Sequence, residues 1–94
     1  MTTYAVRYTY DERSDVRDLV RPEHRAYLGT LKAEGSLHVS GPFVDGAPGA
    51  LLIFEAPDAD QLAELLAGDP FAREGLIAQT EVREWSIAVG SLAG

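Results

Sequence analysis

Alternating and continuous runs of hydrophobic residues predict four strands in this chain. Residues 4–9 are rich in aromatic and β-branched side chains and predict the first strand, and residues 37–40 predict the second. Residues 50–55 predict the third strand and residues 78–89 predict a long fourth one. By contrast, residues 11–20 are charged and only weakly periodic, which predicts a loop or a frayed helical turn.

Two further stretches have the spacing and the end signals of helices. The first begins at Pro22, because proline suits the first helical position, and ends at Glu34, where Gly35 provides a stop. The second begins after Asp58, which can cap the first turn, and ends near Ala67. The chain is therefore predicted to run strand, helix, strand, strand, helix, strand.

This order of elements predicts the fold. Right-handed crossovers favour a ferredoxin-like α+β sandwich of one domain, residues 1–94, with a four-stranded antiparallel sheet and two helices on one face. The alternating strand directions then bring three segments to one end of the sheet. They are residues 21–24, 40–43 and 69–71, and each combines a proline with polar side chains.

The third predicted strand indicates a partner. Residues 50–54 contain no polar side chain in either alternating set, whereas a sheet with one solvated face shows clear alternation. This strand is therefore expected to be covered on both sides, by the helices on one and by a second copy of the chain on the other. The sequence thus predicts a homodimer packed sheet against sheet.

His24 is the first candidate for chemistry at the shared end of the sheet. It lies on a helical face with Tyr27, Leu28 and Leu31, so a polar side chain points inward where an apolar one is expected. Imidazole gains and loses a proton near neutral pH, which suits a general acid or base. The alternative is a half-buried histidine that hydrogen-bonds a backbone carbonyl.

Asp69 is the second candidate. It continues the inward stripe of Leu62, Leu65 and Leu66, which directs its carboxylate toward His24. An aspartate that accepts from one imidazole nitrogen leaves the other nitrogen free to take a proton. The alternative role is an N-cap for the short helix that the next proline would begin. Both roles are compatible, because one carboxylate oxygen can cap while the other orients the ring.

Other residues could bind a substrate. Arg7 or Arg25 could hold a carboxylate or phenolate, although a salt bridge with one of the many acids is the alternative. Gly41 could let a substrate approach the backbone, although a Gly–Pro pair is more often only a turn. The full predicted substrate-binding set is Arg7, Arg25, Ser40, Gly41, Pro42, Phe43 and Phe71.

Composition and charge narrow the classes of function. The chain has 94 residues, no cysteine and a net charge of −7, with 8 basic side chains scattered among 15 acidic ones. Nucleic acid is not an expected partner, because its binding needs a basic patch.

Disulfides and thiolate metal sites are excluded, and His24 and His38 without a carboxylate cluster do not predict a metal site. No apolar run reaches the ~18–20 residues of a membrane span and the start lacks a secretion signal, so a cytoplasmic protein is expected.

An ordered set of short motifs resembles a known protein family. In this order and spacing, the set resembles the YciI-like (YCII-related) family of the dimeric α/β-barrel superfamily. The set spans nearly the whole chain and consists of Arg21-Pro22-x-His24-x-x-x-Leu28, then Gly35, Gly41-Pro42, Asp69-Pro70-Phe71 and Gly75.

That resemblance implies a fold, an assembly and a site. The family has the ferredoxin-like fold and forms dimers, and His24 and Asp69 match its proposed catalytic histidine–aspartate pair. One branch is a dehydrochlorinase that acts on a chlorinated hydroxyquinol, which implies cofactor-free elimination from a small aromatic ring. This chain departs from many relatives by ending soon after its last strand and by its short loop at residues 40–43, and both differences bear on pocket size.

The sequence leaves three functions open. The first is a small cofactor-independent enzyme of the lyase or isomerase type that acts on a small aromatic or enolisable anion. In this enzyme His24 would transfer the proton, Asp69 would orient His24 and an arginine would anchor the anion. The second is a non-catalytic small-molecule-binding or regulatory module, and the third is a purely structural dimeric domain.

Overall fold

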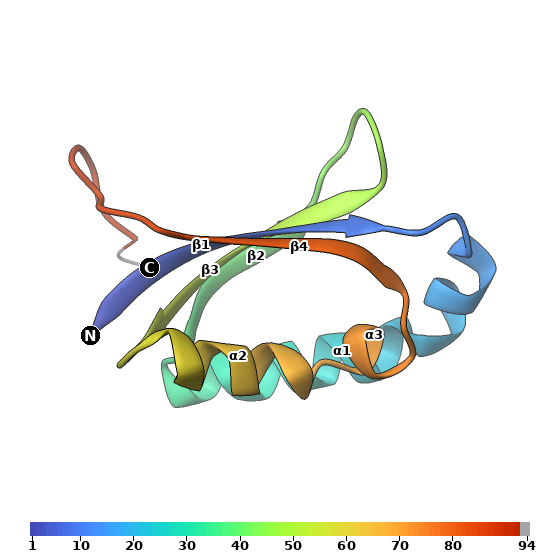
Figure 1. The fold of residues 1–94 in the computed structure, drawn as a ribbon, viewed down its shortest axis with the longest axis horizontal. Helices are drawn as coiled ribbons and strands as arrows, with labels where there is room; N and C mark the ends of the chain where they lie inside the picture. Colours follow the sequence, from blue (N-terminus) through green and yellow to red (C-terminus); the bar gives the residue numbers. More distant parts are fainter. Residues whose placement is uncertain (93–94) are drawn as a thin grey trace.

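Four strands form one antiparallel sheet in the computed structural model, which describes residues 1–92 (Figure 1). The strands are β1 (Thr2–Tyr10), β2 (Leu37–Pro42), β3 (Gly49–Ala56) and β4 (Ile77–Glu84). Their order across the sheet is β2-β3-β1-β4, so that β1 and β3 are central and every pair is antiparallel. This topology confirms the predicted ferredoxin-like α+β fold.

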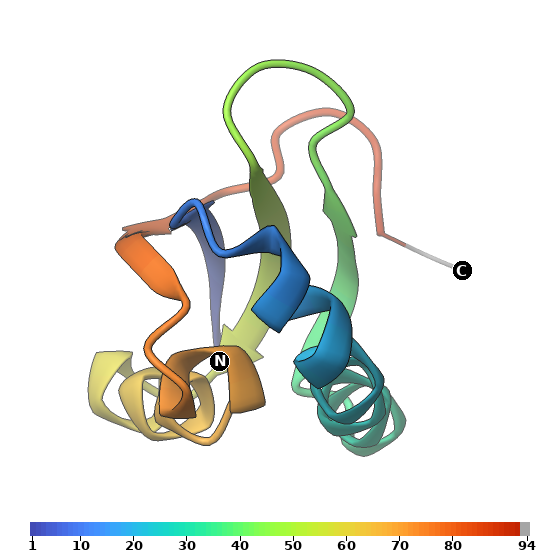
Figure 2. The same ribbon diagram turned by 90° about the vertical axis from the view of Figure 1, so that its right-hand side faces the viewer.

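Three helices of the described residues cover one face of this sheet. They are α1 (Ser14–Glu34), α2 (Ala59–Ala67) and the short α3 (Pro70–Arg73). Figures 1 and 2 show all of them on the same side, while the opposite face of the sheet carries no helix. No helix within residues 1–92 is long and apolar enough to cross a membrane.

The helix ends follow the local signals that the sequence contains. Gly35 ends α1 with a φ of 86°, a left-handed conformation that glycine adopts without steric cost. The Asp58 side chain accepts the backbone N–H of Gln61 at 2.8 Å and thereby caps α2. Asp69 caps α3 in the same way by accepting the backbone N–H of Phe71 at 2.9 Å.

The start of α1 differs from the prediction. The helix begins at Ser14 rather than at Pro22. Of the two alternatives for residues 11–20, the loop is therefore wrong from Ser14 onward, and the frayed turn is a regular part of the helix. Pro22 lies inside the helix, where it lacks the N–H that would bond to the carbonyl of Asp18. Figure 2 shows the first turns of α1 set at an angle to the rest, as expected for a helix bent at a proline.

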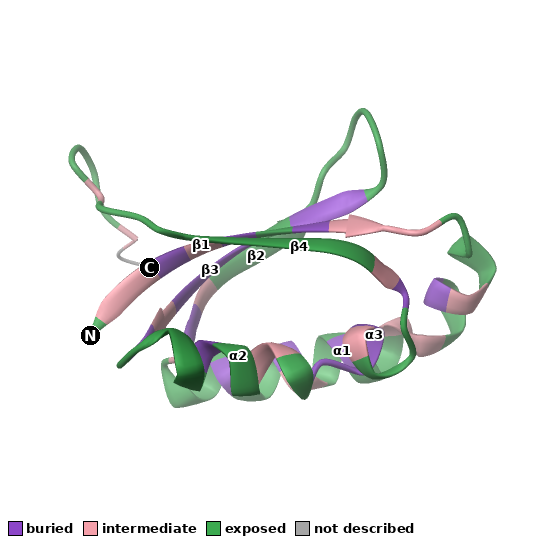
Figure 3. Ribbon diagram, viewed as in Figure 1, coloured by how far each residue is buried: buried purple, intermediate pink, exposed green. Residues whose placement is uncertain are grey.

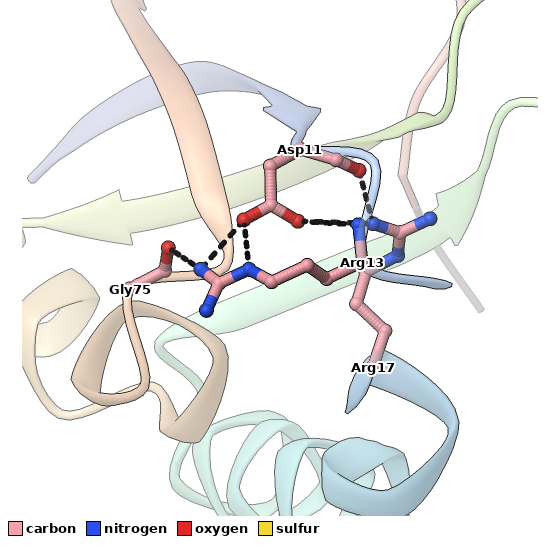
Figure 4. Close-up of polar contacts among 4 residues, drawn as sticks. All are labelled: Asp11, Arg13, Arg17 and Gly75. Atoms are coloured by element: carbon pink, nitrogen blue, oxygen red, sulfur yellow. Dashed lines mark hydrogen bonds and ion pairs between the residues drawn. The ribbon is translucent and has the colours of Figure 1, made fainter. Parts of the chain in front are cut away.

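Tertiary contacts hold the first turns of α1 in place. The Asp11 carboxylate accepts the backbone N–H of Arg13 at 3.0 Å, and the buried guanidinium of Arg17 donates to the Asp11 backbone carbonyl (Figure 4). Arg13 also donates to the carbonyl of Gly75 at 2.8 Å, in the turn that precedes β4. These partners lie at the end of β1 and far along the chain, which is why helical periodicity alone did not reveal this segment.

The last strand is shorter than predicted. β4 ends at Glu84, which pairs with Tyr4, and the expected strand over residues 78–89 continues only as one hydrogen bond from the Trp85 N–H to the Thr3 carbonyl. β1 itself extends two residues further, to Thr2, where it pairs with β3 on its other side. Figure 3 shows β4 exposed along nearly its whole length.

Side chains along β3 point alternately to the two faces of the sheet. Leu52 and Phe54 point toward the helices and are buried, whereas Leu51 and Ile53 point the other way. We name the side away from the helices the open face. Val39, Leu51 and Ile53 line a shallow apolar depression on this face, and Leu51 is 42% exposed there. The main core on the helix side comprises Tyr4, Val6, Tyr8, Leu28, Leu31, Leu37, Ala50, Leu52, Phe54, Ala56 and Leu62.

Candidate active site

The three proline-containing segments meet at one end of the sheet, as predicted from the topology. They surround a cavity of about 230 Å³ that lies between α1, β2 and α3. Its polar lining consists of Tyr10, Arg21, His24, Arg25 and Ser40. Its remaining lining consists of Leu28, Gly41, Pro42, Ala50, Leu52 and Phe71.

His24 and Asp69 form a buried pair behind this cavity. The His24 Nδ1 lies 2.7 Å from the Asp69 Oδ1, and the two residues are only 8% and 1% exposed. A carboxylate can only accept, so in the neutral imidazole Nδ1 carries the hydrogen and Nε2 holds the lone pair. Nε2 makes no hydrogen bond with any described residue, and the ring lines the cavity. The pair therefore has the geometry of an oriented general base.

Asp69 is held by more donors than the sequence indicated. Its Oδ1 accepts both the His24 Nδ1–H and the capping N–H of Phe71. One oxygen therefore both orients the imidazole and caps α3, whereas the sequence led us to expect one oxygen for each role. Its Oδ2 accepts the Tyr8 hydroxyl at 3.0 Å. Because three donors converge on it, the carboxylate is fixed in position and its burial is compensated.

A stack of rings fixes the imidazole from the other side. The His24 and Phe71 rings are parallel within 4°, with centroids 3.9 Å apart. Phe71 in turn meets Tyr10 edge to face at 5.4 Å, and the Arg17 guanidinium lies 5.0 Å from the centroid of the Tyr10 ring. The unexpected first turns of α1 thus contribute to the wall of the cavity through Arg17.

Two tyrosines beside Asp69 are held in their neutral form. Burial, followed by the charge of Asp69, raises the pKa of Tyr8 far above its ordinary value. The same two causes raise the pKa of Tyr10 to about 12, although the charges of Arg17 and Arg21 act in the opposite direction. Both phenols are therefore hydrogen-bond donors at neutral pH.

Positive charge lines the mouth of the cavity. Arg21 donates to Asp18 at 2.5 Å, on the outer side of α1. The Arg25 guanidinium makes no hydrogen bond or ion pair with another residue of the described chain. In a chain with a net charge of −7, two arginines at one cavity favour an anionic ligand. Within residues 1–92, no three His, Asp or Glu side chains are grouped so that they could hold a metal ion.

Two of the predicted site residues lie elsewhere. Arg7 points to the open face, where it pairs with Glu81 at 3.2 Å, because it alternates with the buried Val6 and Tyr8 along β1. Phe43 lies past the end of β2 and lines the apolar depression of the open face instead of the cavity. Neither side chain lines the cavity with His24, and for Arg7 the alternative of a salt bridge with an acidic residue is the arrangement found.

The other predicted residues do come together. Arg25, Ser40, Gly41, Pro42 and Phe71 line the cavity with His24, and Asp69 lies directly behind the ring.

Sequence reasoning missed the roles of Tyr8, Tyr10 and Arg21. A signal for the first two was present, because they share the alternating set of the inward-facing Tyr4 and Val6.

Comparison with known sequences identifies the family. The sequence model of the YCII-related domain matches residues 1–86. The chain belongs to the YCII-related family. It is also 34% identical over 64 residues to the uncharacterized protein YjpA of Bacillus subtilis (strain 168), a match that covers 68% of this chain and 73% of YjpA. The resemblance drawn from the short motifs is thereby confirmed.

Solved structures similar to this YCII-related chain include an enzyme. TftG, the 5-chloro-2-hydroxyhydroquinone dehydrochlorinase of Burkholderia phenoliruptrix AC1100 solved with 2,5-dihydroxybenzoquinone, is 30% identical with a TM-score of 0.80. The match covers 89% of this chain and 93% of TftG.

Two less similar structures share the fold alone. An antibiotic biosynthesis monooxygenase is 19% identical with a TM-score of 0.57 and matches over 95% of this chain and 100% of its own. SnoaB, a cofactor-independent oxygenase of Streptomyces nogalater, is 14% identical with a TM-score of 0.54 and matches over 95% of this chain and 94% of its own.

Proposed function

We propose that this YCII-related protein is a small-molecule enzyme that transfers protons on a small aromatic or enolisable anion without a cofactor. The observation that carries the proposal is the geometry of His24, whose Nδ1 is bonded to the buried Asp69 while its ring lines an open cavity. Similarity to the dehydrochlorinase TftG supports a small-molecule enzyme of this family.

Each group of the cavity has a role in this reaction. Nε2 of His24 takes a proton from a C–H or O–H group of the substrate, and the imidazolium that forms is stabilised by Asp69. Arg25 and Arg21 attract the anionic substrate and counter the negative charge that develops as the proton leaves. Phe71 keeps the imidazole plane fixed, so the ring cannot rotate away from the substrate.

The proton transfer can lead to two products. In elimination, the electron pair released by the broken bond enters the ring system as a leaving group departs with its own bonding pair. In isomerisation, the imidazolium returns the proton to a different atom of the same conjugated system. The same base serves both reactions. A substrate with a leaving group undergoes elimination, and one without a leaving group undergoes isomerisation.

The proposed assembly is a homodimer formed by the open faces of two chains. Val39, Phe43 and Leu51 are 50%, 40% and 42% exposed there, although they are apolar, and they border one shallow depression. A second copy would cover this surface, whereas the cavity is lined by His24 and Leu28 of α1, by Phe71 of α3 and by the helix-facing Leu52 of β3.

Hydrogen exchange on a ring carbon tests the proposed base directly. The probe is 2,5-dihydroxybenzoquinone, a doubly acidic enol whose ring hydrogens exchange with D₂O when a carbon is protonated and deprotonated. Wild-type protein should accelerate this exchange, followed by ¹H NMR, and His24→Gln should lower the acceleration by at least about 100-fold. Asp69→Asn should lower it as well, since the carboxylate no longer stabilises the imidazolium.

His38→Gln is the matched control, because this second histidine pairs with Glu55 at 3.4 Å and does not line the cavity. It should exchange the probe at the wild-type rate. Equal rates for wild-type protein and His24→Gln, with folding verified by circular dichroism, would rule out the proposed base. Tight binding of the quinone without any exchange would favour the binding module over the enzyme.

A further inference from the structure

The hydroxyl of Tyr10 stands apart from those of the other tyrosines near Asp69. Tyr8 donates its hydroxyl to Asp69 at 3.0 Å, and Tyr27 donates to the carbonyl of Leu65 at 2.7 Å. The Tyr10 hydroxyl makes no hydrogen bond with any residue of the described chain, and Tyr10 lines the cavity. No buried side-chain nitrogen or oxygen within residues 1–92 lacks a partner, so the Tyr10 hydroxyl is open to solvent.

The ring that carries this hydroxyl is held firmly. Phe71 packs against it edge to face at 5.4 Å, and the buried Arg17 covers it at 5.0 Å from the centroid. The Arg17 guanidinium is itself fixed by Asp11. Three elements, β1, α1 and α3, therefore fix the Tyr10 ring, although nothing in the described chain bonds its polar end.

The charges around Tyr10 suit an oxygen that becomes negative. Arg21 lies at the same cavity and its charge acts on the phenol, as does that of Arg17. The phenol keeps its proton at physiological pH, because burial raises its pKa to about 12. A neutral phenol can donate a hydrogen bond to an oxyanion, and a nearby guanidinium adds positive charge that stabilises it.

We infer that Tyr10 is a second catalytic residue, which donates its hydroxyl hydrogen bond to the substrate oxygen that becomes negative when His24 removes a proton. This inference rests on the proposed function, since it assigns the electrophilic role in the same cavity. The proton passes from substrate carbon to Nε2, the electron pair of the broken C–H bond moves onto the conjugated carbonyl oxygen, and Tyr10 donates to the resulting enolate. The substrate class is therefore a ring or chain that carries an acidic hydrogen conjugated to a carbonyl or enol oxygen.

The Tyr10→Phe variant tests this role with little structural disturbance. The substitution removes only a hydroxyl that has no partner in the described chain, so the melting temperature should not fall. The exchange of ring hydrogens of 2,5-dihydroxybenzoquinone should slow by about 100-fold. Binding of the same quinone, measured by its visible absorption, should weaken by about tenfold.

Tyr27→Phe is the matched control, since it also removes a tyrosine hydroxyl but one that bonds to Leu65 outside the cavity. It should lower the melting temperature and leave both the exchange rate and the affinity unchanged. A Tyr10→Phe variant within twofold of wild type in both measurements would overturn the inference while the proposed function stands. A wild-type protein that neither binds the quinone nor exchanges its hydrogens would overturn both.

Discussion

Asp69 accepts hydrogen bonds from three donors that belong to three different elements. They are the His24 imidazole on α1, the Tyr8 hydroxyl on β1 and the Phe71 N–H at the start of α3. A carboxylate that is 1% exposed is tolerated only when such partners replace its hydration. The same three bonds fix the direction of the His24 ring, so stability and site geometry depend on one side chain.

The donor from Tyr8 can be removed without changing the core volume appreciably. Tyr8→Phe leaves the Asp69 Oδ2 buried without a partner, so the free energy of unfolding should fall by about 1–3 kcal/mol. Urea denaturation followed by circular dichroism measures this loss. Tyr10→Phe, whose hydroxyl has no partner in the described chain, is the reference and should lose much less. Equal stability of the two variants would contradict the assigned role of Tyr8.

The first turns of α1 depend on contacts outside the helix. Asp11, at the end of β1, binds both Arg13 and Arg17, and Arg13 reaches the Gly75 carbonyl before β4 (Figure 4). The hydrogen bond from the Arg13 backbone N–H is the main reason that the pKa of Asp11 lies below its ordinary range. Arg17 then covers Tyr10, so this junction connects the helix start to the cavity wall.

The Asp11 junction predicts a pH-dependent stability. The folded state lowers the pKa of Asp11, so its charge stabilises the fold fully above the ordinary carboxyl pKa of ~4 and less as pH falls below it. Asp11→Asn keeps the acceptor for the Arg13 N–H and removes only the charge. Its deficit in unfolding free energy should therefore be largest near neutral pH and shrink in acid.

Urea unfolding at a series of pH values measures this deficit. Asp45→Asn is the control, because Asp45 lies in the exposed β2–β3 turn and has no partner in the described chain. It should show no deficit at any pH. A deficit for Asp11→Asn that stays constant from neutral to acid would contradict the electrostatic origin.

At the scale of the whole molecule, helices cover only one face of the sheet. Helices bury Leu52 and Phe54, but Leu51 and Val39 on the open face keep 42% and 50% of their surface exposed. Apolar side chains grouped around one depression are typical of an interface. The proposed homodimer would complete the core on this side.

Leu51→Arg tests the proposed interface. A guanidinium at the centre of the depression should prevent two open faces from meeting, and light scattering after size exclusion should show a shift from dimer to monomer. Leu19→Arg is the matched control, since Leu19 lies on α1 and is already 81% exposed. It should leave the dimer intact. Wild-type protein with the mass of a single chain at micromolar concentration would exclude the proposed assembly.

Much of the fold could be predicted because its signals are local. Strand periodicity, the Gly35 stop and the caps at Asp58 and Asp69 each depend on residues a few positions apart, and all are present. The order of the elements and the handedness of crossovers then place the segments of His24 and Asp69 at one end of the sheet. Local chemistry and chain connectivity together determined the convergence of the candidate site.

Tertiary structure alone decided the remaining features. The helix start at Ser14 depends on partners of Arg13 and Arg17 that lie outside the helix, and β4 ends at Glu84 although β1 extends to Thr2. Likewise, Tyr8 rather than the chain near Asp69 supplies the bond to Oδ2. The Arg13–Gly75 and Tyr8–Asp69 contacts join residues 62 and 61 positions apart, and such contacts leave no periodic or neighbouring signal in the chain. The sequence by itself determined which segments meet, and packing decided which atoms touch.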